Sequence, residues 1–295
     1  MTPLAQAPVL AFDLGGTRLK AGIARDGHIG DQVAVDIEGD PAAAVIAHGR
    51  RFLARTACAA VGLCVPGLVD DGVLVSLPGK HAGLEGTDLR AMLTGAFGVP
   101  AFVSNDAIAY AVGEAVAGAA RGHHRAAVMT VGTGIGVGVI EDGRPLGAGP
   151  LGGGQLGGQI PIAETSDQVD SNGQRGTIEA LCAASRLLTA DAAGAHADVP
   201  GLLVAARRGE PMATAAVEQW RSHFVRAVVA IAHAHTPSVI VVGGGPLADD
   251  AILLDGVEEA ANQRLFGSYR VAVRRAELGD AAALHGIAHL ARSAA

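Results

Sequence analysis

Three apolar strands of this chain run directly into glycine turns, and this repeated pattern constrains the fold more than any other feature. The strands and turns are VLAFDL before Gly15-Gly16-Thr17, AAVMTV before Gly132-Thr133-Gly134, and SVIVV before Gly243-Gly244-Gly245. Glycine permits tight turns and lets backbone N–H groups approach phosphate oxygens closely. The first two turns lead into further strands, which predicts hairpins. An ordinary glycine hairpin is the alternative for any one turn, but three are harder to obtain by chance.

Two familiar nucleotide-binding patterns do not fit these turns. A Walker A loop needs a lysine, whereas the third turn is followed by Pro246. A dinucleotide-binding fingerprint needs a third glycine at the position of Val137. It also needs a helix after the glycines, whereas the second turn leads into a predicted strand. The first two turns are expected to bind phosphates as hairpins. Asp13, at the end of the first strand, is placed to hold water around a nucleotide-bound metal ion.

Strand and helix patterns alternate along the chain. We expect strands at 60–67 and 99–106 and helices at 41–60, 88–97, 107–122, 177–195, 200–209 and 213–235. The alternation predicts an α/β fold rather than α+β. Two rounds, each opening with a hairpin, predict two lobes and a ligand cleft between them. The small α/β lobe would be 1–115, completed by a C-terminal helix at 280–295, and the large α/β lobe 116–279.

Composition excludes several classes of protein. Lys and Arg number 22 against 29 Asp and Glu, giving a net charge of −7, so a nucleic-acid partner is not expected. The 49% hydrophobic content excludes disorder, and the apolar runs are too short for a membrane span. Three cysteines with no C-x-x-C pair indicate reduced thiols. With no secretory signal visible, we expect a cytoplasmic protein.

The sequence resembles the ROK family of sugar kinases and repressors, within the actin-like, hexokinase-like ATPases. The matching segments are DLGGTRLKAGIA, GLCVPGLVDDG, VSNDAIAYAVGE, VGTGIGVGVIEDGRPLGAG, TIEA, PSVIVVGGG and AELGDAAALHGIAHLA, and they run almost end to end. The resemblance implies a two-lobed actin-like (ribonuclease H-like) fold. ATP and Mg²⁺ would lie in a cleft between the lobes, with adenosine near Gly244 and Gly245.

The resemblance also implies the acceptor site. Asp106 matches the family's catalytic base, and Asn105 matches an asparagine that binds sugar hydroxyls. Glu179 matches a glutamate that hydrogen-bonds the sugar, and Gly67 falls at the substrate. A structural alternative exists for both acids. Asp106 could N-cap the following helix, and Glu179 could be a first-turn glutamate favoured by the helix dipole.

The chain departs from the family at its zinc site. The family's Gly-Glu-Ile-Gly-His segment has Gln159 in place of the sugar-binding glutamate and Ile162 in place of the zinc-binding histidine. The family's three cysteine positions are Asp170, Asn172 and Thr177. Structural zinc prefers thiolate and imidazole ligands, so no zinc is expected here.

These departures bear on the substrate. Gln159 can still donate and accept hydrogen bonds, whereas Ile162 can only fill space. An apolar wall suits an altered acceptor, such as an amino sugar or a cyclitol. Lys80 and His81 could face the substrate or be solvated loop residues. The adjacent pair His123-His124 is interpreted as solvated, because no acidic partner is near it in the sequence.

The sequence therefore predicts an ATP-dependent kinase that phosphorylates a primary hydroxyl (6-OH type) of a hexose or hexose-like substrate. A catalytically weak sugar-binding or sensor protein of the same family is the alternative. A repressor is disfavoured because the first phosphate loop begins at Asp13, which leaves no room for a preceding helix-turn-helix. The family resemblance also implies a homodimer.

Overall fold

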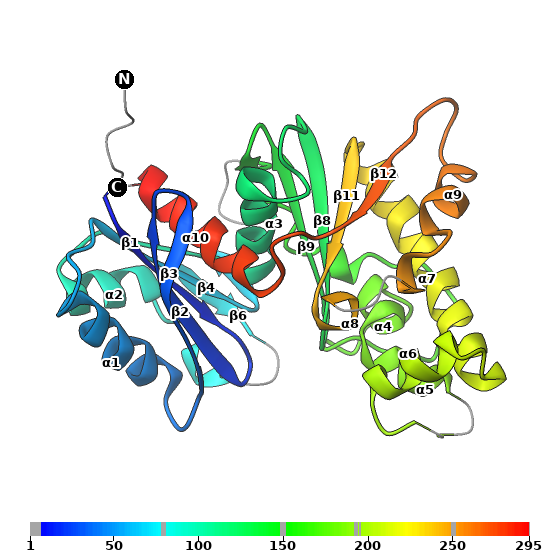
Figure 1. Ribbon diagram of the computed structural model, residues 1–295, viewed down its shortest axis with the longest axis horizontal. Helices are drawn as coiled ribbons and strands as arrows, with labels where there is room; N and C mark the ends of the chain where they lie inside the picture. Colours follow the sequence, from blue (N-terminus) through cyan, green and yellow to red (C-terminus); the bar gives the residue numbers. More distant parts are fainter. Residues whose placement is uncertain are drawn as a thin grey trace.

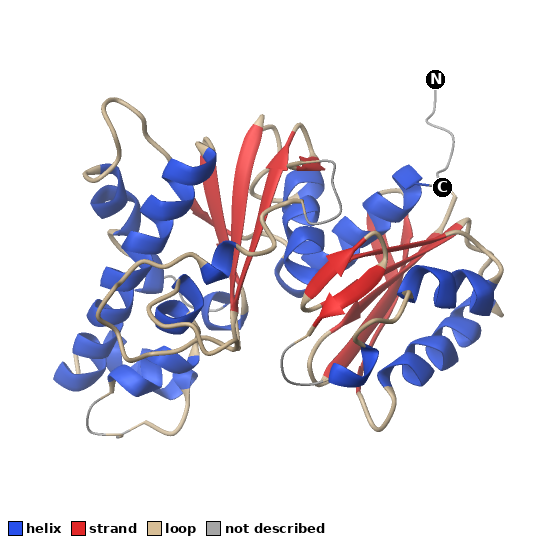
Figure 2. Ribbon diagram, turned by 180° about the vertical axis from the view of Figure 1, so that it is seen from behind, coloured by secondary structure: helices blue, strands red, loops and turns tan. Residues whose placement is uncertain are grey.

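The computed structural model describes residues 7–77, 81–147, 152–191, 194, 196–248 and 252–294. Within them, two five-stranded sheets lie side by side (Figure 1), each at the centre of one lobe. Two helices, α3 (Asp106–Ala117) and α10 (Ala282–Ala294), stand between the sheets. The view from behind (Figure 2) shows further helices on the outer side of each sheet.

The first sheet has the strand order β3-β2-β1-β4-β7. Its strands are β1 (Val9–Leu14), β2 (Arg18–Arg25), β3 (His28–Asp36), β4 (Ala60–Val65) and β7 (Ala101–Asn105). The strands β1, β2 and β3 pair antiparallel, whereas β1, β4 and β7 pair parallel. The carboxyl ends of the three parallel strands therefore meet at one edge of the sheet.

Alternation along β1 distributes its side chains between two layers. Leu10 and Phe12 belong to the core under α1 (Pro41–Leu53) and α2 (Leu89–Phe97), whereas Val9 and Ala11 pack with α10. A small antiparallel pair, β5 (Leu68–Asp70) and β6 (Val73–Ser76), and the 3-10 turn η1 (Ala82–Leu84) complete this lobe.

The second sheet has the order β10-β9-β8-β11-β12. Its strands are β8 (Arg125–Val131), β9 (Ile135–Glu141), β10 (Arg144–Pro145), β11 (Val239–Gly243) and β12 (Ala272–Arg275). The strands β8, β11 and β12 run parallel, and β9 pairs antiparallel with β8. Ala126 and Val128 of β8 pack towards α3, whereas Ala127 and Met129 pack into the larger core beneath the outer helices.

The outer helical layer carries most of the second lobe's core, including the single tryptophan, Trp220. It comprises η2 (Gly157–Gln159), α4 (Ile178–Cys182), α5 (Ser185–Ala190), α6 (Val199–Arg207), α7 (Pro211–His235), α8 (Gly245–Ala248), η3 (Ile252–Leu254) and α9 (Val257–Asn262), with η4 (Gly279–Ala281) leading into α10. No helix in the described part of the chain has both the length and the apolar character needed to cross a bilayer.

Glycines bring α3 and α10 into backbone contact. A Cβ added to Gly286 of α10 would overlap the carbonyl oxygen of Ala109, and one added to Gly113 of α3 would overlap that of Ala282. The buried Glu114 side chain accepts hydrogen bonds from the backbone N–H groups of Glu277 (3.2 Å) and Leu278 (2.9 Å). The segment that returns from the second sheet to α10 is therefore attached to α3.

The expected helices over 88–97, 200–209 and 213–235 agree with the structure to within two residues at each end, whereas three others differ more. The helix expected over 41–60 ends at Leu53, because β4 begins at Ala60. The helix expected over 107–122 ends at Ala117, where the Glu114 carboxylate captures the N–H of Ala119. The segment 177–195 forms two short helices, because Ala183 has an extended backbone (φ −56°, ψ 150°). The division of lobes at residue 115 stays a prediction, and it falls inside α3.

Replacing Gly286 with alanine is expected to lower the free energy of unfolding by about 1–3 kcal/mol, because the new methyl group forces α3 and α10 apart. Gly95 is a matched control inside α2, where an added Cβ would meet no atom within 4 Å. We expect Gly95→Ala to be neutral or to stabilise by up to about 1 kcal/mol. Urea unfolding measures both, and an unchanged midpoint for Gly286→Ala would contradict the close helix contact.

Candidate active site

Two carboxylates lie at the edge where the parallel strands of the first sheet end. Asp13 is the penultimate residue of β1, and Asp106 follows the last residue of β7. The strand between them, β4, places Cys64 opposite Asp13 and Val65 opposite Asn105. The Cys64 thiol donates weakly to an oxygen of Asp13 (3.6 Å). The folded sheet thus brings together two acids that are 93 residues apart.

The Asp106 carboxyl group has strongly altered acidity. Burial raises its pKa to about 7, the negative charge of Asp13 adds to the rise, and hydrogen bonding opposes it, led by the backbone N–H of Ala107 (2.8 Å). Burial also raises the pKa of Asp13 above its ordinary value, and the Lys20 ammonium partly offsets that rise. A carboxyl group with a pKa near neutrality is suited to accept a proton at working pH.

Asn105, rather than Asp106, caps α3. Its Oδ1 accepts the N–H of Ile108 (3.1 Å), and its Nδ2 donates to the carbonyl oxygen of Gly67 (2.8 Å). The interpretation of Asp106 as the N-cap is therefore wrong by one residue, because Asn105 has the extended backbone of a cap (φ −65°, ψ 145°). Gly67 has φ +90° and no room for a Cβ beside the carbonyl of Ser76.

The first two glycine turns are each closed by a backbone hydrogen bond, but the bond spans three residues in the first turn and two in the second. The N–H of Gly15 donates to the carbonyl of Arg18 (2.9 Å), and the N–H of Gly132 donates to the carbonyl of Gly134 (2.9 Å). Gly16, Thr17 and Thr133 are exposed, at the tips of these turns. In Figure 1 the carboxyl ends of β1 and β8 both lie towards the lower side of the molecule, so the two turns open in the same direction.

The third turn packs against the second. Gly244 has φ +109°, and a Cβ there would overlap the carbonyl oxygen of Val131, the last residue of β8. Gly243 leaves space for the Tyr110 hydroxyl from α3, while Gly245 is exposed and begins α8. Glycine is therefore required at 244 by both conformation and space.

Glu179 lies beside the second turn. Its Oε2 accepts the N–H of Ile135 (3.3 Å), its Oε1 accepts the N–H of Ser171 (2.8 Å), and it leaves no room for a side chain at Gly134. Gln159 ends η2 and is half-buried. The neighbouring carbonyl of Ile160 accepts the N–H of Ile178 (2.9 Å), which ties the Gln159 segment to the helix that carries Glu179.

Two contacts at the first turn were not identified from the sequence. The Lys20 ammonium lies 3.9 Å from Asp13 and 3.2 Å from Asp280, and His81 Nε2 lies 3.1 Å from the Gly15 carbonyl. The hairpin register could have revealed Lys20, because Asp13 and Lys20 are directly paired. Lys80 lies outside the described residues.

The chemistry of the site fits one expected metal and not the other. Two nearby acids, Asp13 and Asp106, suit a divalent cation that arrives with a nucleotide, and the charge of Asp13 raises the pKa of Asp106. At the family's four zinc positions, Asp170, Asn172, Thr177 and Ile162 provide one carboxylate, an amide, a hydroxyl and an apolar side chain. The described residues contain no cluster of three or more His, Cys, Asp or Glu side chains placed to hold a metal ion. These residues do not fit structural zinc.

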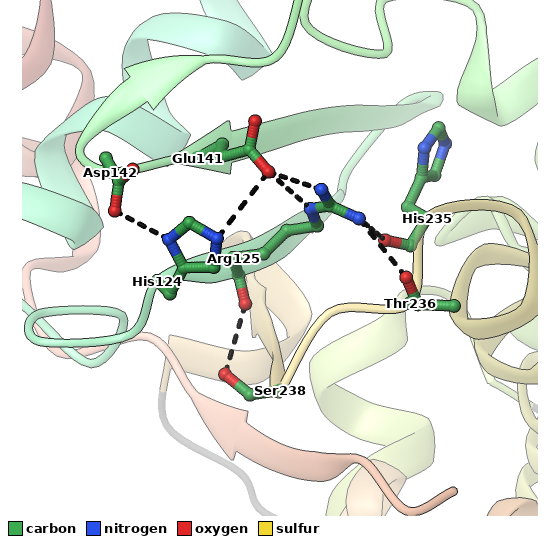
Figure 3. A network of polar contacts seen from close by, with 7 residues as sticks. All are labelled: His124, Arg125, Glu141, Asp142, His235, Thr236 and Ser238. Carbon is green, nitrogen blue, oxygen red and sulfur yellow. Dashed lines mark hydrogen bonds and ion pairs between the residues drawn. The ribbon is translucent and has the colours of Figure 1, made fainter.

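The pair His123-His124 lies away from this site: His124 belongs to the network of Figure 3, and His123 contacts the Ser238 hydroxyl (2.8 Å). His124 contacts Asp142 (Nδ1 to Oδ1, 2.6 Å) and Glu141 (3.8 Å), acids that the fold brings to it from 17 and 18 residues away, and its side chain is 69% exposed, as the interpretation of a solvated residue expects. Arg125 joins Glu141 to the end of α7 through the His235 carbonyl (3.1 Å). Arg125 starts β8, about 20 Å from the second turn at about 3.3 Å per residue. This network therefore belongs to the opposite end of the sheet.

A cavity of about 400 Å³ lies on one side of Asn105. Ser104, Ile108, Arg90 and Gln155 are among its other lining residues, and Asp106 is not. Gln155 crosses from the second lobe to β5, where its side chain pairs with both backbone groups of Val69 (3.0 and 3.2 Å). Among the described residues expected to bind the acceptor, Asn105 is the one that lines this cavity.

Comparison with known proteins agrees with this arrangement. A model described as the ROK family matches residues 9–294. A glucokinase of Thermotoga maritima is 27% identical, over 88% of this chain and 89% of its own length. The structure of a ROK family glucokinase from Streptomyces griseus in complex with glucose and AMPPNP has a TM-score of 0.83 and 26% identity, covering 97% of this chain and 99% of that one.

A ROK hexokinase from Thermus thermophilus is similar to the same degree. Its TM-score is 0.83 at 31% identity, with 97% of this chain and 98% of that chain covered. The expected two-lobed, actin-like α/β fold is confirmed by these similarities.

The Asp106→Asn variant is expected to be more stable than the unaltered protein at pH 8, because it removes a buried charge. The folded state holds this proton with a pKa of about 7, against an ordinary value of 3.8. Stability of the unaltered protein therefore falls as pH rises between those values, by at most about 1.4 kcal/mol per unit. Melting temperatures at pH 5 and pH 8 measure this effect. Asp36→Asn, which alters an exposed carboxylate, is the control. If the melting temperature of Asp106→Asn relative to that of the unaltered protein is the same at pH 5 and pH 8, the prediction is refuted.

Proposed function

The chain belongs to the ROK family, and we propose that this ATP-dependent sugar kinase uses Asp106 as the general base for a primary hydroxyl of a hexose or hexose-like substrate. The supporting observation is the carboxyl group of Asp106, which lies at the carboxyl edge of the first sheet beside Asp13 with a pKa raised to about 7. Phosphoryl transfer demands mainly positioning, electrostatic stabilisation and a proton acceptor.

The nucleotide would be held from both lobes. The turns Gly15–Thr17 and Gly132–Gly134 would bind the phosphates through backbone N–H groups other than those of Gly15 and Gly132, which donate within the turns, with the Thr17 and Thr133 hydroxyls as further donors. Adenosine would lie near Gly244 and Gly245. Magnesium bound with the nucleotide neutralises phosphate charge, and Asp13 would hold its water shell.

The acceptor would be oriented beside Asp106. Asn105 uses one amide hydrogen on Gly67, and its second N–H donor can serve a sugar hydroxyl. Glu179 is fixed by two backbone N–H groups and retains acceptor capacity for the sugar, and Gln159 can donate or accept. Asp106 then takes the hydroxyl proton as the phosphoryl group moves in line.

The acceptor class follows from the altered edge of this site. Ile162 packs against the core of the second lobe, so that edge presents an apolar side chain instead of a histidine. An amino sugar or a cyclitol is therefore the alternative to glucose. A catalytically weak sensor is the second candidate, favoured by the same substitution. The expected homodimer and cytoplasmic location stay predictions.

The Asp106→Asn variant is expected to lower kcat by about 10²- to 10⁴-fold while the KM for ATP changes little, because only the proton acceptor is lost. An ATP-coupled assay with a panel of hexoses, amino sugars and cyclitols measures this. In the unaltered protein, kcat/KM should rise with pH through the pKa of Asp106, and the variant should lack that ionisation.

Asp36→Asn, which removes an exposed carboxylate at the end of β3, controls for the loss of one negative charge. Equal turnover by Asp106→Asn and the unaltered protein would remove the assignment of the base. Saturable sugar binding without phosphoryl transfer to any acceptor would favour the sensor.

A further inference from the structure

The loop from Asp170 to Thr177 carries a buried carboxylate that the proposed mechanism does not use. Asp170 is only 8% exposed, and it occupies a position where the family motif has a cysteine. Its Oδ1 accepts the backbone N–H groups of Asn172 (2.9 Å) and Gln174 (2.9 Å). Its Oδ2 accepts the hydroxyl of Thr177 (3.0 Å). Three donors therefore satisfy a charge that would otherwise be costly to bury.

Thr177 connects this carboxylate to the helix that carries Glu179. Its hydroxyl donates to Asp170 and also accepts the N–H of Ala180 (3.1 Å), so it N-caps α4. Thr177 is 1% exposed and occupies a second cysteine position of the family motif. One hydroxyl thus joins both ends of the loop.

The loop also contacts Glu179 directly. The N–H of Ser171, the residue after Asp170, donates to Glu179 Oε1 (2.8 Å). The hydrogen bonds of Asp170 to Asn172 and Gln174 turn the backbone on the far side of Ser171. The position of the Ser171 N–H, and with it the aim of the Glu179 carboxylate, depends on that turn.

Backbone contacts tie the loop to the altered sugar edge. The carbonyl of Gly176 accepts the N–H groups of Ile162 (2.8 Å) and Ala163 (3.1 Å), and Gly176 has φ +66° with no room for a Cβ beside Ala163. Ile162, at the family's histidine position, is therefore held by backbone pairing to the loop that Asp170 closes.

We propose that Asp170 is a positioning residue that closes the loop 170–177 through hydrogen bonds and so aims Glu179 at the acceptor, without a structural zinc ion. The aim of Glu179 at a sugar rests on the proposed function, whereas the hydrogen-bonded closure does not. In zinc-binding relatives the resemblance implies metal ligands at the same positions. Here Asp170 and Thr177 join the two ends of the segment with a carboxylate and a hydroxyl.

The Asp170→Ala and Thr177→Val variants test this proposal through sugar kinetics. Each is expected to raise the KM for the acceptor about tenfold, because a hydrogen bond to a charged group is lost, while kcat and the KM for ATP stay within about threefold. Thr177→Ser keeps the hydroxyl and should restore the acceptor KM. Asp167→Ala, which removes an exposed carboxylate paired with Arg175 nearby, is the matched control.

Asp170→Asn separates hydrogen bonding from metal binding. The amide keeps an acceptor for the two backbone N–H groups and can donate to the Thr177 hydroxyl, so it should behave closer to the unaltered protein than Asp170→Ala does. Purified protein should contain no stoichiometric zinc, and a zinc chelator should leave its melting temperature unchanged. Stoichiometric zinc, or failure of Asp170→Asn together with chelator sensitivity, would overturn the proposal.

Coupling to Glu179 distinguishes positioning from general stability. The acceptor KM of Asp170→Ala/Glu179→Gln should match that of Glu179→Gln alone, because both changes remove one interaction. Independent, multiplying effects would overturn the positioning role. Fluorescence of Trp220, whose Nε1 donates to the Cys182 carbonyl at the end of α4 (3.0 Å), reports whether that helix stays packed in each variant.

Amide exchange separates failure of this proposal from failure of the proposed function. If no acceptor is phosphorylated, the kinase proposal fails, but faster exchange of the Asn172, Gln174 and Ala180 amides in Asp170→Ala still supports the closure. If the kinase is active and these amides exchange as in the unaltered protein, the Asp170 proposal is overturned while the function stands.

Discussion

The junction between β7 and α3 is the contact on which the rest of this structure depends. The Asn105 side chain caps α3 and at the same time holds the Gly67 carbonyl of the next strand connection. The helix therefore begins at the sheet edge and carries Asp106 in its first turn. From there α3 passes between the two sheets, where glycines allow it to meet α10 at backbone distance. One capped helix thus sets both the packing of the lobes and the position of the acid.

Burial and charge act together on that acid. Desolvation raises the pKa of Asp106, and the neighbouring Asp13 adds a like charge, while Lys20 lies near Asp13. The same helix places Glu114 deeper, where backbone N–H groups of the returning chain satisfy it. The two acids of α3 therefore lie in different surroundings: Asp106 is near another carboxylate, whereas Glu114 accepts hydrogen bonds from backbone N–H groups.

In the second lobe, hydrogen bonds of Asp170 join the ends of the loop 170–177, where the family resemblance implies metal ligands. Zinc needs thiolate or imidazole ligands, and the chain has a carboxylate and a hydroxyl at two of the positions concerned. A carboxylate surrounded by N–H and O–H donors can close a loop of this length by itself. Such a closure requires the chain itself to supply every hydrogen-bond donor. The turn at Gly173 (φ +80°) and the Thr177 cap provide these donors.

The sequence by itself determined the elements whose cause is local. Apolar runs ended by glycine turns gave β1, β8 and β11, and the alternation of strands and helices gave the α/β class. Helix ends were less predictable, since α1 stops at Leu53 and α3 at Ala117 for reasons that involve later parts of the chain. Family resemblance supplied the proposed roles of Asp106 and Glu179, which spacing alone could not.

Only the tertiary structure decided which side chains meet. Asn105 became the cap, His124 met Glu141 and Asp142 across a hairpin, and Asp170 met the Thr177 hydroxyl. These contacts depend on strand register and on the path of the loops. Both are fixed by packing against residues that are distant in the sequence. Local propensity records the backbone preference of each segment, whereas the partners of a buried polar group are known only once the surrounding chain has folded around it.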